Sequence, residues 1–320
     1  MARGRHRAEG GLTVASAGAP LPPANGLSVD VEEWFQVGAF ERAIDCADWP
    51  AMASRVEGNV DFLLDLFAEA GVSATFFTLG WVAERHPALM RRIADAGHEL
   101  ASHGYDHARV FTLSRRAFAE DIARARRSIE DASGEKVTGY RAPSFSIDAR
   151  NPWAFEELAR AGYAYSSSVA PVAHDHYGWP EAPRFAFRPV AGSPLVELPV
   201  TTALMGGRRV AAGGGGFFRV LPYGFSRWAI RQVNMREARP AVFYFHPWEI
   251  DPGQPRVANA PLRSRLRHYT GLSAMAGKLR RLLDDFAWER VDAVAAREAV
   301  RAEDFAVGTL TQGAAEREAA

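Results

Sequence analysis

The stretch RVEGNVDFLLDLFAEAGVSATFFTLG, residues 55–80, contains a helix pattern followed at once by a strand pattern. Its first part is amphipathic, and Gly71 is suited to end the predicted helix as a C-cap. The β-branched and aromatic residues of 72–80 then predict a strand. This stretch therefore predicts one helix-to-strand unit of an α/β fold.

The same alternation continues along most of the chain. A buried strand is expected at 27–31. The later strands are expected at 98–103, 137–143, 163–169 and 241–247, and the other helices at 81–97, 114–132, 151–162, 225–237 and 273–287. Strands and helices at this spacing predict a parallel sheet wound by right-handed crossovers. Several such units in succession favour a barrel, in which the chemistry lies at the carboxyl ends of the strands.

The composition of the 320 residues is that of an ordinary globular protein, with 48% hydrophobic residues and a formal net charge of zero. No basic stripe indicates nucleic acid as a partner. The single cysteine, Cys46, excludes an intramolecular disulfide framework and leaves the compartment open. No stretch reaches the roughly 18 apolar residues that a bilayer crossing needs, so no transmembrane segment is expected.

One folded domain is expected between two flexible ends. Residues 1–26 are positively charged but lack an uninterrupted apolar run, so we expect a disordered leader rather than a signal peptide. Residues 301–320 are rich in Ala and Glu and are expected to form a flexible tail. The folded domain would then span residues 27–300.

Three carboxylates, Asp30, Glu32 and Glu33, stand at the end of the first expected strand. Residues two apart on a strand share a face, so Asp30 and Glu32 can point into one site while Val31 points away. These carboxylates could equally be solvated turn residues. However, Asp30 lies within an apolar strand, where a carboxylate is costly unless it is paired or bound to a cation.

Two histidines, His103 and His107, follow another expected strand in SHGYDH, residues 102–107. Two imidazoles at this spacing can meet one ion if the chain turns after the strand, and neutral imidazole suits Zn²⁺. The pair alone is weak evidence, because both could be polar residues at a strand end. A carboxylate from a different strand would complete three protein ligands with an open position, as in a catalytic zinc site.

Two further residues stand at expected strand ends. Arg141, in YRAPSF, can pair with a carboxylate and hold it ionised. His246, in FYFHPWEI, would be the third histidine at the same rim, although a lone histidine is more often structural than catalytic.

Other polar clusters are weaker candidates. The glycines at 213–216 lack the Gly-Lys-Ser/Thr ending of a phosphate-binding loop, so a plain loop is expected there. His174, Asp175 and His176 are interpreted as a substrate-lining loop. Residues 166–168 are serines, but they lie outside any Gly-x-Ser-x-Gly pattern.

Taken together, several motifs resemble those of the polysaccharide deacetylase family, the NodB-type carbohydrate esterases. In chain order they are LSVDVEEWFQV, TFFTLGWVAE, GHELASHGYDH, GYRAPSFSI, VELPV, GGGGFFRVLPY and VFYFHPWEID. The resemblance covers about residues 27–290 and is greatest to deacetylases associated with exosortase and exopolysaccharide gene clusters. It implies a distorted (β/α) barrel and a divalent metal, usually zinc, held by one acidic residue and two histidines.

The resemblance also implies roles for individual residues. Asp30 matches the general base, Arg141 matches the arginine that pairs with this base, and His246 matches the general acid. The residues that match metal ligands are Glu32, His103 and His107.

Two departures from the family pattern leave questions open. Glu32 stands where many members have Asp, and Glu33 beside it could compete as the metal ligand. Ser166 stands where the subfamily usually has Asp, so any contribution of that aspartate is absent or is supplied elsewhere.

The resemblance implies an enzyme that removes N-acetyl groups from an N-acetylhexosamine polymer, such as an exopolysaccharide. Because no signal peptide is evident, we expect it in the cytoplasm, or at the periphery of the inner membrane, where such a polymer can be modified. The residues expected to contact the sugar are Pro143, Tyr177, Trp179 and Trp248, although aromatic residues of this kind could equally be core. Two alternatives stay open: a cyclic amide or ureide hydrolase on the same barrel, and a non-catalytic carbohydrate-binding homologue.

Overall fold

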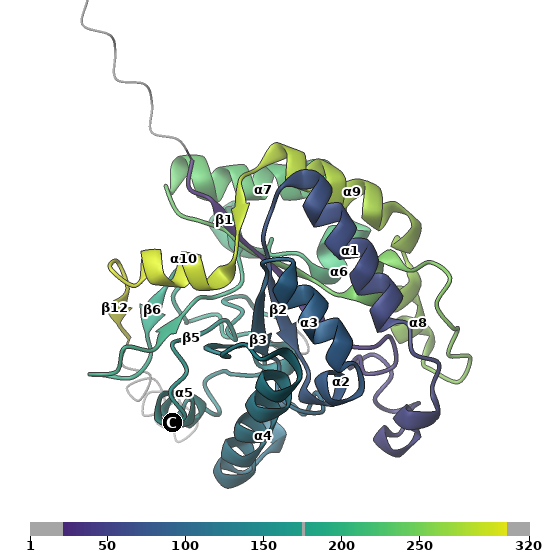
Figure 1. Ribbon diagram of the computed structural model, residues 1–320. Coiled ribbons are helices and arrows are strands. Elements are labelled where there is room, and N and C mark those ends of the chain that lie inside the picture. Colours follow the sequence, from purple (N-terminus) through teal and green to yellow (C-terminus); the bar gives the residue numbers. More distant parts are fainter. Residues whose placement is uncertain (1–21, 175–176, 306–320) are drawn as a thin grey trace, which may run out of the picture.

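The computed structural model describes residues 22–174 and 177–305. One curled sheet forms its centre, with helices packed on the outside (Figure 1). The strand order is β10-β1-β2-β3-β4-β5-β7-β6-β12, and β11 pairs with the start of β1. All neighbouring strands on this path are parallel except β6 and β7. The predicted distorted (β/α) barrel is therefore confirmed.

The strands are short, and their bounds follow in chain order. They are β1 (Asn25–Val31), β2 (Thr75–Thr78), β3 (Glu99–Ser102), β4 (Gly139–Tyr140), β5 (Tyr165–Ser166), β6 (Phe187–Arg188), β7 (Val196–Glu197), β8 (Thr202–Met205), β9 (Arg208–Ala211), β10 (Val242–Phe245), β11 (Trp288–Glu289) and β12 (Glu303–Asp304). Strands β8 and β9 form a separate antiparallel hairpin.

The helices lie between these strands. The α-helices are α1 (Val56–Ala70), α2 (Gly80–Arg85), α3 (Pro87–Asp95), α4 (Arg115–Ser133), α5 (Trp153–Arg160), α6 (Gly215–Val220), α7 (Tyr223–Arg236), α8 (Leu262–Tyr269), α9 (Leu272–Asp285) and α10 (Val291–Glu298). Four 3₁₀ turns are also described, η1 (Cys46–Ala51), η2 (Val110–Thr112), η3 (Pro143–Phe145) and η4 (Pro247–Ile250).

The local sequence explains the unit formed by α1, β1 and β2. All seven residues of β1 are buried, as expected of a parallel strand covered on both faces. The side chains of Val60, Leu63 and Phe67 lie at helical spacing on the buried face of α1. Gly71 then ends the helix in the left-handed conformation, at φ 64°, as the sequence predicted.

Several predicted elements differ in detail from those observed. The helix predicted at 81–97 is broken, because Pro87 has no N–H to donate and instead begins α3. The glycines at 213–216 are not wholly a loop, since the last two of them begin α6. The first strand begins at Asn25 rather than at residue 27.

The chain ends bear on the predicted domain limits. Beyond residue 300, β12 pairs with β6, so the sheet extends past the predicted end of the folded domain. The predicted leader falls largely in residues 1–21, and the predicted tail largely in 306–320, both outside the described residues. Within the part of the chain that is described, no helix combines the length and apolar character needed to cross a membrane.

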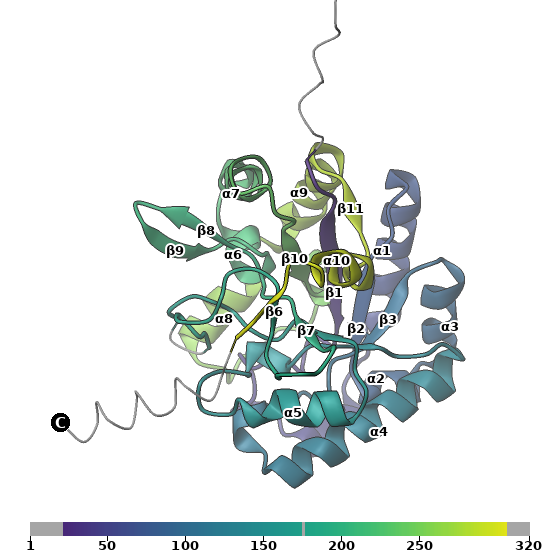
Figure 2. The same ribbon diagram turned by 90° about the vertical axis from the view of Figure 1, so that its left-hand side faces the viewer.

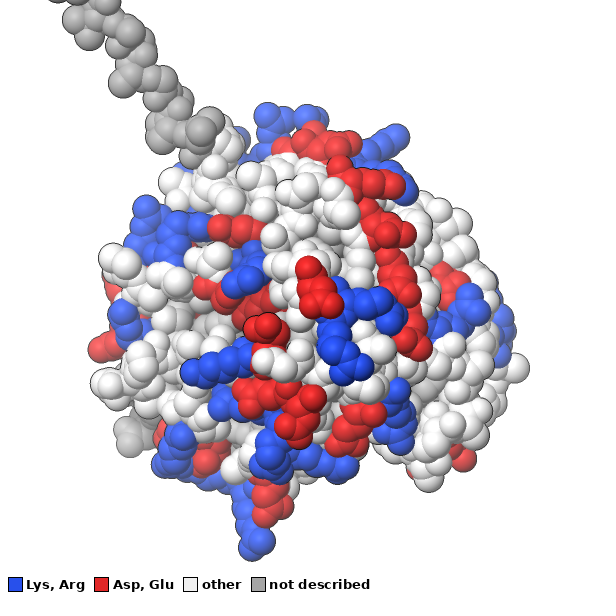
Figure 3. All heavy atoms as spheres, in the orientation of Figure 1, with Lys and Arg blue, Asp and Glu red and all other residues white. Residues whose placement is uncertain are grey.

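The outer face formed by α3 and α4 carries charges of both signs side by side (Figure 3). Arg92 pairs with Asp61 at 2.9 Å, and Arg116 pairs with Glu120 at 2.8 Å. Paired charges of this kind leave no single-sign field on this face that would attract a polyanion.

A carboxyl group is buried at the amino-terminal end of β3. Glu99 accepts hydrogen bonds from the hydroxyls of Thr75 and Tyr165. Burial, together with the charge of Asp292, raises the pKa of Glu99 from its ordinary value of 4.5 to about 7. Between these two pH values the folded state binds more protons than the unfolded state, so the free energy of unfolding contributed by Glu99 falls as the pH rises.

Replacing Glu99 by Gln should therefore stabilise the protein at pH 8 but not at pH 4.5. The amide stays neutral and can still accept hydrogen bonds from Thr75 and Tyr165. One pKa unit corresponds to about 1.4 kcal/mol, so the shift from 4.5 to about 7 corresponds to a gain of about 3 kcal/mol at the higher pH. Urea unfolding of both proteins at each pH checks this, and an equal difference at both values would contradict it.

Candidate metal centre and active site

The candidate residues meet at one rim of the barrel because neighbouring parallel strands end there. Strands β10, β1, β2, β3 and β4 lie side by side in that order. The predicted residues stand at or just after their carboxyl ends: Asp30 and Glu32 at β1, His103 at β3, Arg141 at β4 and His246 at β10. His107 follows His103 in the loop after β3. The structure thus brings all six together.

Glu32, His103 and His107 can hold a metal ion. Each offers one ligand atom, and these atoms all lie within 4.8 Å of one another. Oε2 of Glu32 is 2.9 Å from Nε2 of His107, and no other described group donates a hydrogen bond to this buried oxygen. A buried carboxylate oxygen that faces imidazole nitrogens is the arrangement that a shared cation would complete.

Neighbouring groups fix the orientation of these ligands. Nδ1 of His103 lies 2.9 Å from the carbonyl oxygen of Arg141, so a proton on Nδ1 leaves Nε2 free to bind metal. The indole N–H of Trp248 donates to Oε1 of Glu32 at 3.0 Å. His103 and Glu32 are therefore held in orientations that suit ligation of a divalent metal.

The choice between the two adjacent glutamates follows from their contacts. Glu33 accepts hydrogen bonds from the hydroxyl of Ser54 and from the backbone N–H groups of Arg55 and Val56. It thereby satisfies free N–H groups at the start of α1. Only Glu32 faces the two histidines, so its geometry favours it as the metal carboxylate.

The protonation states of the cluster also suit a metal. Burial alone would raise the pKa of Glu32, but the charges of His107 and His246 hold it well below its usual range. Burial lowers the pKa of His103 to about 4. At neutral pH the carboxylate is therefore ionised and His103 is neutral, as metal ligation requires.

The backbone is strained beside this cluster. His107 has φ 64°, and Ser144 and Phe145, just after Pro143, have φ 55° and 49°. Among the described residues only Ala238 also combines a side chain with a positive φ. Strain of this kind costs of order 1–3 kcal/mol per residue and clusters at functional sites. It cannot be read from the sequence.

Asp30 and Arg141 form a buried ion pair. Nη1 of Arg141 lies 2.6 Å from Oδ1 of Asp30, and the two side chains are 0% and 2% exposed. The guanidinium also donates to the hydroxyl of Ser28 at 2.7 Å and to the carbonyl oxygen of Ser167 at 3.0 Å. These partners hold the arginine, and through it the aspartate, in one position.

His246 stands on the other side of Glu32, with 3.7 Å between its Nε2 and Oε1 of that residue. Its Nδ1 lies 3.2 Å from Oε2 of Glu249, which is itself paired with Arg219 at 3.0 Å. Burial opposes the charged imidazole, but Glu32 and Glu249 outweigh burial and raise the pKa of His246 to about 9.

Replacing Glu249 by Gln should lower the pKa of His246, because one of the two carboxylates that stabilise its imidazolium is lost. If His246 is a general acid, the enzyme is active only while this group is protonated. The basic limb of the profile of kcat/KM against pH should then shift to lower pH by about one pH unit. If kcat/KM instead falls by the same factor at every pH and the basic limb stays in place, Glu249 acts only as a structural residue.

Two of the residues predicted to contact sugar are buried. Trp248 is 6% exposed and is stacked between His246 and His268, at ring separations of 5.1 and 4.2 Å, so neither indole face is free. Trp179 is 2% exposed and packs against Phe305. Both indoles are thus enclosed by other side chains, and the N–H of Trp248 is already bonded to Glu32; contact of either residue with sugar stays a prediction.

The other predicted contacts stay predictions. Pro143 is buried at the start of η3. Tyr177 is partly buried, 6.0 Å from Phe145 and stacked on His174 at 4.1 Å. Asp175 and His176, which were expected to line the substrate with His174, lie outside the described residues.

A carboxyl group lies near Ser166, the position where aspartate is usual. Glu197 in β7 accepts hydrogen bonds from the N–H groups of Ser168 and Val169 at 2.8 Å each. Burial raises the pKa of Glu197 to about 7, while a hydrogen bond from Ser166 opposes this rise. Glu197 is therefore a carboxyl from another strand beside the substituted position, and the sequence interpretation missed it.

The sequence analysis also missed Glu249 as a partner of His246, although the short spacing between the two residues could have indicated it. It stands three residues after His246, a spacing at which a 3₁₀ turn brings a carboxylate back to the residue before the turn. The role of Trp248 as a donor to Glu32 had no such signal, because these residues are 216 positions apart.

Two family models match consecutive parts of the chain. The polysaccharide deacetylase model matches residues 48–166, and a domain of unknown function, DUF3473, matches residues 167–296. Because β5 of the first matched part pairs with β7 of the second, both parts contribute strands to one sheet.

Curated relatives carry related names. A peptidoglycan deacetylase of Helicobacter pylori is 30% identical over 147 residues, which are 46% of this chain and 48% of that protein. A chitooligosaccharide deacetylase of Sinorhizobium fredii is 39% identical over 82 residues, which are 25% of this chain and 38% of that protein. The chain thus spans less than half of the length of either relative.

Solved structures share the fold. A Mycobacterium smegmatis protein assigned as a polysaccharide deacetylase has a TM-score of 0.58 at 22% identity, covering 90% of this chain and 96% of its own. One from Pseudomonas aeruginosa has a TM-score of 0.56 at 16% identity, covering 89% and 96%. At such identities these likenesses show the fold alone. The match of the polysaccharide deacetylase model to residues 48–166 shows that this part of the chain is similar to that family.

Proposed function

We propose that the protein is a metal-dependent hydrolase that removes N-acetyl groups from an N-acetylhexosamine-containing polysaccharide. The observation that carries this proposal is the cluster of Glu32, His103 and His107 beside the Asp30–Arg141 pair. The named activities of the peptidoglycan and chitooligosaccharide deacetylases among the relatives support the choice of an N-acetylated glycan.

Glu32, His103 and His107 would hold the metal, most simply Zn²⁺, because two imidazoles and one carboxylate are a ligand set of catalytic zinc. When bound, such an ion would supply Lewis acidity at the acetamide carbonyl and would lower the pKa of water. Trp248 would keep one oxygen of Glu32 occupied, so that the other stays directed at the histidines.

The remaining residues would carry out the proton transfers. Asp30, held in position by Arg141, accepts a proton from the water whose oxygen forms the new bond to the carbonyl carbon. His246, charged below its raised pKa, donates a proton to the sugar nitrogen as the carbon–nitrogen bond breaks. The products are acetate and a free amine, and all atoms are accounted for.

We further propose that the polymer is an exopolysaccharide or its precursor, and that the protein works in the cytoplasm or at the periphery of the inner membrane. The support is the resemblance of the seven quoted motifs, taken together, to exopolysaccharide-associated deacetylases. Three of them, VELPV, GGGGFFRVLPY and VFYFHPWEID, lie in residues 167–296, which the second family model matches.

Acetate release from N-acetylglucosamine oligomers tests the proposed function. We expect release from the protein as isolated with zinc, loss of release after removal of metal by a chelator, and recovery when Zn²⁺ is returned. Release that survives complete removal of metal would contradict the metal-dependent mechanism. Stoichiometric zinc binding without acetate release from any N-acetylated oligomer would contradict the substrate class, and cyclic amides would then be assayed.

A further inference from the structure

The hairpin of β8 and β9 projects from the body of the protein beside α7 (Figure 2). It is not hydrogen-bonded to the main sheet. Its turn is made by Gly206 and Gly207, both in the left-handed region, at φ 58° and 78°. Residues 204–208 are all exposed, so the tip of the hairpin is a convex surface.

Apolar side chains gather on this tip and on the adjoining face of α7. Met205 is 53% exposed and Met235 is 63% exposed, and Leu204 and Trp228 are each exposed by more than a third. These are four of the ten large apolar side chains exposed within the described residues. Such clustering on a folded surface indicates a binding surface, whereas single exposed apolar residues need no explanation.

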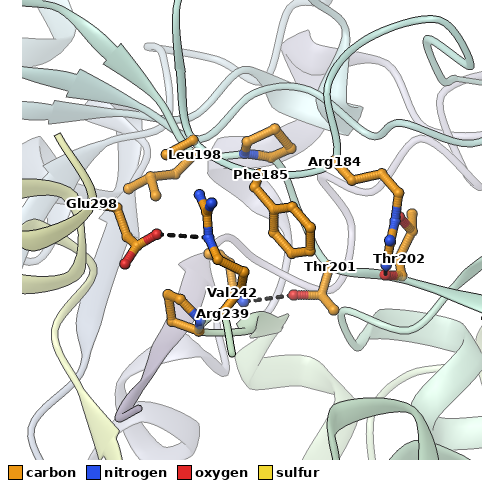
Figure 4. A pocket seen from close by; sticks show the side chains of 11 residues that line it. Arg184, Phe185, Leu198, Thr201, Thr202, Arg239, Val242 and Glu298 are labelled. Atoms are coloured by element: carbon orange, nitrogen blue, oxygen red, sulfur yellow. Dashed lines mark hydrogen bonds and ion pairs between the residues drawn. The ribbon is translucent and has the colours of Figure 1, made fainter. Parts of the chain in front are cut away.

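The hairpin and the helix are fastened to each other, so the patch is one surface. The side-chain amide of Gln232 in α7 accepts from the N–H of Leu204 and donates to its carbonyl oxygen, both at 2.9 Å. At the base of the hairpin, Arg184 donates to the hydroxyl of Thr202 and pairs with Glu237, just after α7. Figure 4 shows Arg184 beside Thr202 at the edge of a small cavity.

The patch carries positive charge that no neighbouring acid compensates. Arg208 at the turn and Arg231 on α7 are exposed, and neither forms an ion pair with any described residue. The acids close to α7 are already used, because Glu237 pairs with Arg184 and Asp285 pairs with Arg227.

We propose that this hairpin–helix patch, formed by Leu204, Met205, Arg208, Trp228, Arg231 and Met235, binds the surface of an anionic lipid bilayer. Apolar side chains at the tip of a projecting hairpin can enter the interface between headgroups and acyl chains, where tryptophan is also favoured. Arginines around them extend to anionic headgroups, which attract each basic residue near the surface.

The shape and charge of the patch favour lipid over other occupants. A second copy of the chain would present the same positive charge and the same convex tip, so the two would repel. The patch is also separate from the candidate active site. Thr201, just before β8, bonds to Val242 at the start of β10, whereas His246 follows the opposite end of that strand. Membrane binding would therefore leave the rim of the barrel open.

Sedimentation with lipid vesicles tests the proposal. The full chain is mixed with vesicles of phosphatidylcholine alone or of phosphatidylcholine with phosphatidylglycerol. We expect binding to the anionic vesicles only. Met205→Ser removes apolar contact, and Arg208→Glu reverses a charge, and each should weaken the binding by about tenfold. Both positions are exposed and flank the turn at the tip of the hairpin, so folding should be unaffected.

The matched controls are Leu262→Ser and Arg263→Glu on α8, which change an exposed leucine and an exposed arginine elsewhere. They should leave vesicle binding unchanged. Absence of binding by the unaltered protein, or equal weakening by the control variants, would overturn the proposal. So would light scattering that shows a dimer dissociated by Met205→Ser, because the patch would then join two copies.

The result is independent of the proposed function. Acetate release from soluble oligomers should be unchanged in Met205→Ser and in Arg208→Glu, because neither residue is at the rim that holds Glu32. Failure to bind vesicles would thus leave the deacetylase proposal untouched, and failure to release acetate would leave the membrane proposal untouched.

Discussion

Replacing Asp30 by Asn is expected to lower kcat for acetate release by about 10²–10⁴-fold, the usual contribution of a general base. The amide has almost the same shape as the carboxylate and can still accept a hydrogen bond from Arg141, 2.6 Å away. It cannot accept a proton from water at neutral pH. The change therefore removes the proposed base while the surrounding geometry is kept.

Zinc binding is the control for this variant. Asp30 is not among the three residues whose ligand atoms cluster within 4.8 Å, so the variant should still bind one equivalent of zinc with little change in affinity. Unchanged acetate release in the variant would exclude Asp30 as the base. Loss of zinc together with activity would show that Asp30 is a ligand instead.

Replacing Arg141 by Met is expected to lower the free energy of unfolding by about 3–5 kcal/mol, the usual cost of leaving one partner of a buried ion pair uncompensated. Both side chains are almost fully buried, so solvent cannot take the place of the guanidinium. Urea unfolding at neutral pH measures the effect. Acetate release should fall as well, because Asp30 loses the group that holds it in position.

The double variant Asp30→Asn with Arg141→Met separates charge from packing. A neutral amide needs no cation, so the double variant should be more stable than Arg141→Met alone. If the two substitutions destabilise the protein additively, the loss comes from packing around Arg141, for example against Phe77 at 4.0 Å, and not from the charge of Asp30.

Local patterns predicted the elements of the barrel and the residues at its rim. Apolar spacing marks which face of a helix or strand is buried, and Asp30, Glu32, His103, Arg141 and His246 each stand next to an apolar strand. Since parallel strands end at one rim, strand order alone brings these residues together. This is why the site was accessible from the sequence.

Contacts between distant residues were not accessible in this way. The sequence left open whether Trp248 stacks on sugar or packs in the core. In the structure its ring stacks on His246 and on His268, and His268 comes from a helix whose position depends on the whole fold. The β8–β9 hairpin was hidden in a stretch rich in glycine. Its pairing depends on the turn at Gly206 and Gly207, and the stretch has no clear alternation.

The two adjacent glutamates show the same limit. Glu32 and Glu33 have identical side chains, and only the contact of Glu33 with the start of α1 distinguishes them. A sequence pattern predicts that a carboxylate is present at the rim, but the tertiary contacts decide which one faces the histidines.

Zinc titration of the metal-free protein, followed by calorimetry, tests the proposed metal centre most directly, with Glu32→Gln and Glu33→Gln as a matched pair. We predict one equivalent of zinc bound by the unaltered protein and by Glu33→Gln, and binding weakened by at least about tenfold in Glu32→Gln, since a charged ligand is lost. Unfolding curves recorded in parallel show that each variant is folded. Zinc binding that survives in Glu32→Gln but is lost in a folded Glu33→Gln would contradict the assignment, and no binding by the unaltered protein would contradict the metal centre itself.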